Sequence, residues 1–278
     1  MRQFCKYLLL LSHFQGPHHV RRHNRISHPL RPLDPASSPS YLILTSIIDT
    51  PSAENERKYS ANWAGAVLES PPPNATYTYI CATITVPTPS PTPADDGVDT
   101  MFQAASAWVG IDGATYTSAI LQTGISMNVI NGVVSIDAWY EWYPDWATYY
   151  DDEDFAIQPG DILVASVNVT ASNRGICAME NLSTGQSASA TAKARRSSAT
   201  LAGANAEWVV ESHPSEGGTV PFVGFGEVAF QGCTAASSRG ESVGLANATV
   251  YEMVIDDVVV ASVEALDDRT MAIQRQGI

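Results

Sequence analysis

The chain has 278 residues, of which 45% are hydrophobic, so it can bury a core of ordinary size and is not disordered throughout. Residues 1–58 hold eight of the 15 Lys and Arg residues but only four of the 29 Asp and Glu residues, which leaves residues 59–278 with a formal charge of −18. A body this acidic repels nucleic acid and anionic membrane surfaces, so the sequence predicts neither as a partner.

The first 58 residues are expected to form a leader that precedes a single domain at 59–278. They are basic, rich in His and Pro, and show no sustained apolar period. The apolar run Tyr7–Leu11 is shorter than the core of an ordinary signal peptide, and a second run covers Tyr41–Ile48. Either the signal is degenerate or the true start differs from the one given.

Glycosylation motifs favour an extracellular, secreted glycoprotein. An N-x-S/T sequon is a signal for a surface loop in a secreted protein, and four such sequons occur in the body. Asn168 is expected on the solvent face of a strand, where a glycan could attach. The four sequons begin at Asn74, Asn168, Asn181 and Asn247.

Histidine and cysteine counts narrow the chemistry that the body can perform. Its only histidine is His213, whereas zinc sites and serine or cysteine hydrolases usually need one or more His. We therefore expect no metal and no cofactor, and proton transfer by Asp and Glu. The body cysteines Cys81, Cys177 and Cys233 permit at most one internal disulfide, and the sequence does not choose among the three pairings.

Short β-type runs separated by turn residues begin after Tyr59. In 78–86 and again in 162–171, apolar and polar residues alternate with the period of a strand that has one face in a core. Similar runs follow at 207–211, 227–230, 243–255 and 258–264, with Asp256-Asp257 as a hairpin turn between the last two. The pattern predicts an all-β fold, an antiparallel sandwich or barrel.

Three segments of the body combine carboxylates or amides with aromatic residues: Ser106–Gly113 followed by Ala119–Gly124, then Asp137–Pro144, and then Asn205–Glu211. Period-two geometry places Asp137, Trp139, Glu141 and Tyr143 on one face of a strand, and a second strand carries Glu207, Val209 and Glu211 on one face. Such faces are unsuited to a dry core and suit a substrate-facing groove. The alternative is that the aromatics pack the sandwich while the acids lie in water at strand ends.

The chain resembles the glutamic peptidases, also called eqolisins, through essentially the whole body. Any one of the matching motifs would be weak evidence, but together they follow in the family's order over some 160 residues. They are Asn62-Trp-Ala-Gly-Ala66, Trp108-Val-Gly-Ile-Asp112, Ile120-Leu-Gln-Thr-Gly124, Asp137-Ala-Trp-Tyr-Glu-Trp-Tyr-Pro144, Glu180-Asn-Leu-Ser-Thr-Gly185, Asn205-Ala-Glu-Trp-Val-Val-Glu211 and Val220-Pro-Phe222.

This resemblance implies a concanavalin-like sandwich of two curved antiparallel sheets and a catalytic pair formed by Gln122 and Glu211. It also implies a monomeric zymogen with a removable propeptide that binds its own body, and protein or peptide substrates. Ser126 stands where family members often have Asp, which affects a hydrogen bond or a subsite. Candidates for substrate binding are Trp108, Asp112, Trp139, Glu141 and Tyr143.

Peptide hydrolysis without a metal needs a base for water, an acid for the leaving amine and a stabiliser for the oxyanion. Glu211 can act as base and then as acid, and Gln122 can donate to the oxyanion. A carboxylate near its ordinary pKa of roughly 4.3 works best in acid, so we expect an acid endopeptidase. Aspartic-peptidase motifs are absent. The remaining alternative is a β-sandwich glycoside hydrolase that uses Glu141 and Glu211, or a related carbohydrate-binding module.

Overall fold

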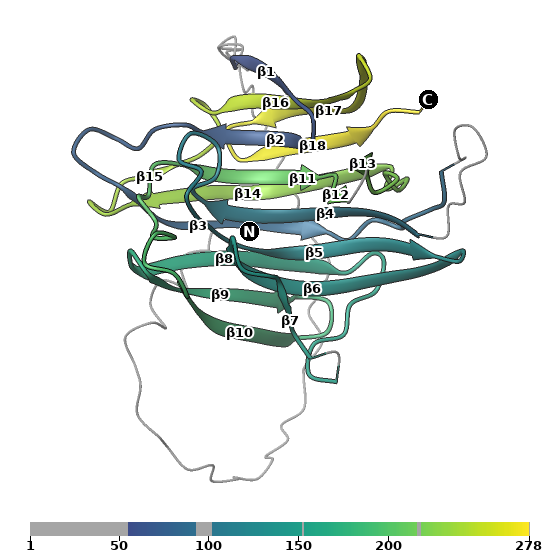
Figure 1. Ribbon diagram of the computed structural model, residues 1–278, viewed down its shortest axis with the longest axis horizontal. Helices are drawn as coiled ribbons and strands as arrows, with labels where there is room; N and C mark the ends of the chain where they lie inside the picture. The colour runs from purple at the N-terminus through teal and green to yellow at the C-terminus, as the bar shows by residue number, and fades with distance from the viewer. Residues whose placement is uncertain (1–54, 93–101, 152, 216–217, 278) are drawn as a thin grey trace, which may run out of the picture.

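The computed structural model describes residues 55–92, 102–151, 153–215 and 218–277. Most of the expected leader, including Cys5 and five of the six histidines, therefore lies outside the described residues. Within these ranges all regular structure is β-strand (Figure 1). The prediction of an all-β fold is confirmed.

The strands are numbered in chain order. Two short strands, β12 and β13, pair only with each other, and β7 and β15 are also only two residues long. The bounds are β1 Arg57–Ser60, β2 Trp63–Leu68, β3 Tyr77–Thr85, β4 Phe102–Ile111, β5 Ile120–Ile130, β6 Val133–Tyr143, β7 Thr148–Tyr149, β8 Ile162–Ala171, β9 Arg174–Asn181, β10 Gln186–Lys193, β11 Ala206–Glu211, β12 Pro214–Ser215, β13 Gly218–Thr219, β14 Glu227–Ser237, β15 Ser242–Val243, β16 Thr249–Ile255, β17 Val258–Asp267 and β18 Thr270–Arg275.

The long strands form two packed layers that are joined along one side. Hydrogen bonding is continuous in the order β10-β9-β8-β3-β14-β18-β17-β16-β2-β11-β4-β5-β6-β7. The path folds back at β17 and β16, so that β4 and β5 pack on β3, β8 and β9 of the other half (Figure 1). The expected antiparallel sandwich is thus made from one folded sheet.

The core lies between the layers and follows the alternation in the sequence. Ile80, Ala82 and Ile84 of β3 are buried in it, as are Leu163, Ala165 and Val167 of β8. The opposite face of β8 differs from the expectation of a wet surface, because Ser166 is only 4% exposed. The neighbouring Tyr79 hydroxyl interacts with it.

The β16–β17 connection matches the hairpin that was expected at Asp256-Asp257. Both residues have positive φ, at 50° and 61°, as a two-residue type I′ turn requires. Asp tolerates this left-handed conformation better than most residues because its short side chain can bond locally.

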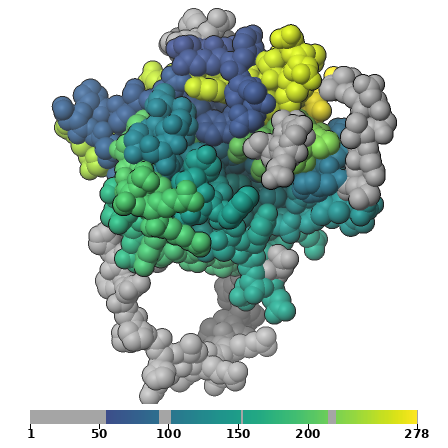
Figure 2. Space-filling view, viewed as in Figure 1, coloured from purple at the N-terminus to yellow at the C-terminus, as the bar shows by residue number. Residues whose placement is uncertain are grey.

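Strand β1 crosses the boundary that the sequence suggested at residue 58. It pairs in parallel with β16, and Figure 2 shows this early segment on the surface beside the late segments of the chain. Two ion pairs fix it: Arg57 binds Glu252 at 2.5 Å and Lys58 binds Glu69 at 2.7 Å. Residues 55–58 therefore pack as part of the body.

No helix in the described part of the chain is long and apolar enough to cross a membrane. Cys177 and Cys233 are both buried and free. None of the three pairings among Cys81, Cys177 and Cys233 that the sequence left open is therefore formed.

Candidate active site

One face of five adjacent strands, β2, β11, β4, β5 and β6, collects the chemically reactive residues. Strand register sets Trp63 beside Glu211, Val209 beside Trp108, and Glu207 beside Gly110. Gly110 is in turn opposite Gln122, which is opposite Glu141. We call this surface the polar face; it points away from the main core, and the expected sharing of one face along β6 and β11 is confirmed.

Two glycines make room for the Trp108 side chain on this face. A Cβ at Gly124 would lie 2.1 Å from the Ala107 carbonyl oxygen and 2.6 Å from Cβ of Trp108. A Cβ at Gly110 would meet the Trp108 ring at 2.9 Å and Cβ of Gln122 at 3.3 Å. The six-membered ring of the indole therefore occupies the space beside Gly110 that a side chain would need.

Glu211 is held by neutral donors at the end of β11. Trp108 Nε1 donates to its Oε2 at 2.9 Å, and Asn62 Nδ2 donates to its Oε1 at 3.3 Å. The Trp63 indole N–H also interacts with this carboxyl group, but outside hydrogen-bond geometry. Burial raises the pKa of Glu211 to about 7, since it outweighs these donors and the negative charge of nearby Glu141 adds to it.

Gln122 is oriented by Glu141 on the next strand. Its Nε2 donates to Glu141 Oε2, which leaves the Oε1 atom buried without a hydrogen-bond partner. Burial raises the pKa of Glu141, and the charge of Asp145 adds to this, while the bond from Gln122 opposes it. The amide is thereby fixed with one free acceptor and one free N–H.

A small aromatic cluster covers the space between these groups. Trp108, Trp139 and Val209 form it, with Trp63 and Ala147 packed against them. The rings of Trp63 and Trp108 meet edge to face with centroids 5.2 Å apart. This apolar packing excludes water around Glu211, which explains the desolvation that raises its pKa.

The polar face also concentrates buried polar atoms that lack hydrogen-bond partners. Buried polar groups are normally paired, so a cluster of unpaired ones marks a place where a ligand or water completes the bonding. Within the described residues eight such side-chain atoms occur. Five of them belong to this face: Trp63 Nε1, Ser106 Oγ, Gln122 Oε1, Trp139 Nε1 and Glu207 Oε2.

Asp112 was expected to bind substrate, but its carboxylate is directed elsewhere. It is fully buried at the end of β4, with φ 64°, and accepts four backbone N–H groups from residues 202–205 at 2.6–3.2 Å. All its acceptor capacity is used within the protein. In this structure Asp112 positions the segment that leads into β11.

The other expected site residues differ in exposure. Trp108 and Trp139 are buried, Glu141 is partly buried, and Tyr143 is 45% exposed at the end of β6. Ser126 is buried and lies between Ser106 and Asp137 on the neighbouring strands. The hydroxyl groups of Ser106 and Ser126 therefore extend the polar face along β4 and β5.

Several residues at the site had no assigned role in the sequence reasoning. Asn62 and Trp63 were quoted only as a motif, and Ser106 only as part of a segment. Glu207 is completely buried, with Oε1 accepting from Ala114 N at 2.9 Å. Burial raises its pKa well above the ordinary value, because that single bond does not offset desolvation and the nearby charges of Asp112 and Glu211.

Among the described residues no group of three or more His, Cys, Asp and Glu side chains could hold a metal ion. The polar face instead offers three carboxyl groups with raised pKa values, those of Glu141, Glu207 and Glu211, together with one oriented amide and unpaired indole donors. This set can supply a proton, accept a proton and hold a polar tetrahedral centre.

A protein-family model, a related sequence and solved structures that match this chain are all described as peptidases. The family model described as Peptidase A4 family matches residues 61–275. Aspergillopepsin-2 of Aspergillus niger is 37% identical over 219 residues, which cover 76% of each chain. A crystal structure of scytalido-glutamic peptidase with a transition state analog inhibitor superposes with a TM-score of 0.66 and 31% identity, and covers 79% of this chain and 100% of that one. Aspergilloglutamic peptidase from Aspergillus niger gives a TM-score of 0.58 and 38% identity, over 63% and 99% of the two chains.

Proposed function

Since the chain belongs to the Peptidase A4 family and is a glutamic-type peptidase, we propose that Glu211 and Gln122 are its catalytic pair. The observation that supports this assignment is the position of Glu211. It is the carboxyl group of the polar face that accepts a hydrogen bond from Trp108 of the aromatic cluster and another from Asn62, and its pKa is about 7. The glycoside hydrolase alternative is not favoured by the comparisons.

In the first step the carboxyl group of Glu211 acts with both oxygens. At acid pH it is protonated, because its pKa is about 7. Its O–H donates to the carbonyl oxygen of the scissile peptide, while its other oxygen accepts a proton from the attacking water. The carbon–oxygen bond forms, a neutral tetrahedral diol results, and Glu211 ends the step protonated again.

In the second step the same carboxyl group donates its proton to the peptide nitrogen and takes one from the diol. The carbon–nitrogen bond breaks, and amine and acid are released. Gln122 contributes its unpaired Oε1 as acceptor for the water and its second N–H as donor to the developing oxyanion. Because its amide is neutral at every pH, it does not compete for the proton.

We also propose that the enzyme is a secreted, monomeric acid endopeptidase made with a propeptide within residues 1–58. The acidic body, the four sequons and the basic leader support this proposal. Protonation of Glu211 below about pH 7 supports activity in acid, although for a different reason from the unperturbed carboxylate that the sequence suggested.

The test is hydrolysis of an unfolded protein substrate in acid by Glu211→Gln and Gln122→Ala. Each should lower kcat by roughly 10²–10⁴, the usual contribution of acid–base or oxyanion groups. Glu264→Gln, the same change at an exposed position on β17, is the control and should leave kcat unaltered. A Glu211→Gln enzyme with more than about a hundredth of the wild-type turnover would contradict the assignment.

A further inference from the structure

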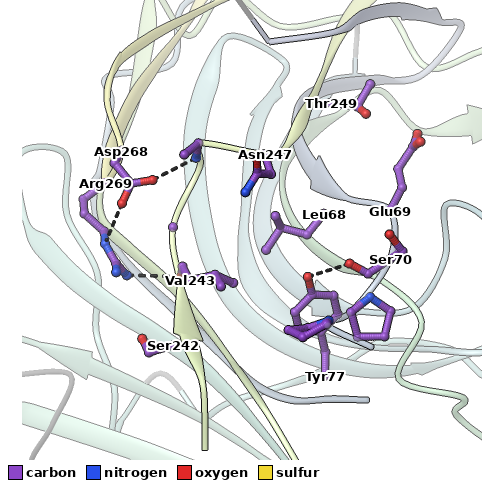
Figure 3. A pocket seen from close by; sticks show the side chains of 14 residues that line it. Leu68, Glu69, Ser70, Tyr77, Ser242, Val243, Asn247, Thr249, Asp268 and Arg269 are labelled. Carbon is purple, nitrogen blue, oxygen red and sulfur yellow. Dashed lines mark hydrogen bonds and ion pairs between the residues drawn. The ribbon is translucent and has the colours of Figure 1, made fainter. Parts of the chain in front are cut away.

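A cavity of about 550 Å³ lies apart from the polar face, at the end of β2 (Figure 3). Its walls are the loop that follows β2, the segment from β15 to the start of β16, and the β17–β18 turn. The volume falls within the range of about 300–1,000 Å³ that is typical of small-molecule sites. The lining residues include Leu68, Glu69, Ser70, Pro71, Pro72 and Asn247.

The lining has the chemistry that carbohydrates use. Ser70 and Ser242 provide hydroxyls, and Asp268 provides a carboxylate that keeps acceptor capacity beside its bond from Ala246 N and its ion pair with Arg269; all of these can bond to sugar hydroxyl groups. The carboxylate of Glu69 is largely used by Lys58 and Tyr251. Pro71 and Pro72 contribute apolar ring surface. The lining therefore mixes apolar surface with a few polar groups, as ligand sites do.

Asn247 stands at the edge of this cavity on a fixed turn. The turn runs from Leu245 to Ala248, closed by Ala248 N donating to Leu245 O at 2.9 Å. Asn55 Nδ2 donates to Leu245 O at 2.9 Å and to Ala248 O at 2.8 Å. Asn247 itself is exposed, and its side-chain amide makes no hydrogen bond to any residue that the structure describes. Figure 3 shows it between Asp268 and the Leu68–Glu69 wall.

The sequon at Asn181 is the opposite case. Asn181 is completely buried, and its Nδ2 donates to Asp161 Oδ2 at 2.8 Å and to Ala156 O at 3.3 Å. Its Oδ1 accepts from Ser183 N at 3.0 Å and from Thr184 N at 3.3 Å. Every bonding position of this amide is used, so the folded chain has no place for a glycan there.

We propose that Asn247 carries an N-linked glycan whose first sugars lie in this cavity, and that Asn181 carries none. The inference rests on the proposed entry into the secretory pathway. In the modification the Asn247 nitrogen loses one proton and bonds to the anomeric carbon of the sugar. The bond from that carbon to the pyrophosphate of a lipid-linked oligosaccharide breaks, and the lipid pyrophosphate leaves with the electron pair and takes up the released proton.

This placement keeps the glycan away from Glu211. Leu68, at the cavity, pairs with Ala206, five residues before Glu211 on β11. At about 3.3 Å per residue this separates the two positions by about 17 Å along the strand. Asn74 and Asn168 are also accessible in part, but neither lines the cavity.

The experiment is to express the full chain behind a yeast host's own secretion signal and collect it from the medium. Endoglycosidase H leaves one N-acetylglucosamine at each occupied site, which peptide mass spectrometry then locates. We expect the tag at Asn247 and none at Asn181. Thr249→Ala should remove the tag and Thr249→Ser should retain it, because Ser preserves the sequon.

An unmodified Asn247 in the secreted protein, or a tag at Asn181, would overturn the inference. Because the host signal supplies entry into the pathway, such a result would leave the proposed secretion untouched. Secretion is tested separately with the chain's own first residues.

A second experiment tests whether the first sugars of the Asn247 glycan lie in the cavity. It uses the inactive Glu211→Gln variant, which does not digest the glycosidase. Release of the Asn247 glycan should be several-fold slower from the folded than from the denatured chain, and equal rates would refute the seating.

Discussion

Replacing Glu211 by Gln should reduce the dependence of stability on pH, by an amount that follows from the raised pKa. Burial raises the pKa of Glu211 from 4.5 to about 7. Since each pKa unit is worth about 1.4 kcal/mol, this residue contributes about 3 kcal/mol. A folded pKa above the unfolded value means that this stability is fully present below about pH 4.5 and is lost as the pH rises through about 7. Gln does not titrate, so the Glu211→Gln variant does not lose this part of its unfolding free energy as the pH rises.

The assay is urea unfolding between about pH 4 and about pH 8, followed by tryptophan fluorescence. Both proteins carry Gln122→Ala, so that proteolysis does not disturb the equilibrium. The protein with Glu211 should lose about 3 kcal/mol more across this range than its Glu211→Gln counterpart. If the free energy of unfolding falls equally with pH in the two proteins, the reasoning is refuted, because the buried carboxyl group is then not the source of the pH dependence. Any difference between their stabilities at the lowest pH does not change this conclusion.

Three further outcomes are expected. The kcat/KM for peptide hydrolysis should be constant in acid and fall through about pH 7 as Glu211 loses its proton; a rise toward neutral pH would contradict the protonated starting state. Glu141→Gln removes a negative charge that raises the pKa of Glu211, so the falling limb should move to lower pH by less than about one unit, and an unmoved limb would show that the two groups are not coupled. Asp112→Asn should destabilise the protein by about 2 kcal/mol or more in urea unfolding, because it sets an NH₂ group against two of the four backbone donors; a change under about 0.5 kcal/mol would contradict the bonding described.

Alternation in the sequence was enough to find strands whose one face meets the core. The run at 162–171 coincides with β8, and 78–86 differs from β3 by one residue at each end. Pairing was not predictable in the same way. Strand β2 pairs with β11 and β16, which are far away in the sequence, and no local pattern encodes such a partner. Strand β1 was missed because its contacts are backbone pairing and ion pairs, which leave no apolar period.

At the site, the side chains that lie within regular strands were predictable, and those outside the strands were not. Period two correctly placed Trp139, Glu141 and Tyr143 on one face, since this geometry depends on the strand alone. Asp112 lies just beyond β4 with a positive φ, so its side chain leaves the alternation. The assignment of Gln122 and Glu211 as catalytic came from family resemblance and stays a proposal. Nothing in the local sequence could show that their surroundings lack a cation.

The absence of cations at the polar face connects the composition of the protein to its proposed chemistry. None of the ion pairs formed between described residues involves Glu141, Glu207 or Glu211. An Arg or Lys beside Glu211 would stabilise its charged form and lower its pKa, which would leave a carboxylate that can only accept a proton. Burial and the negative charge of Glu141 instead keep it protonated, because they outweigh the neutral donors that bind it. One carboxyl group can then donate and accept in the same step, and the scarcity of Lys and Arg in residues 59–278 preserves this state.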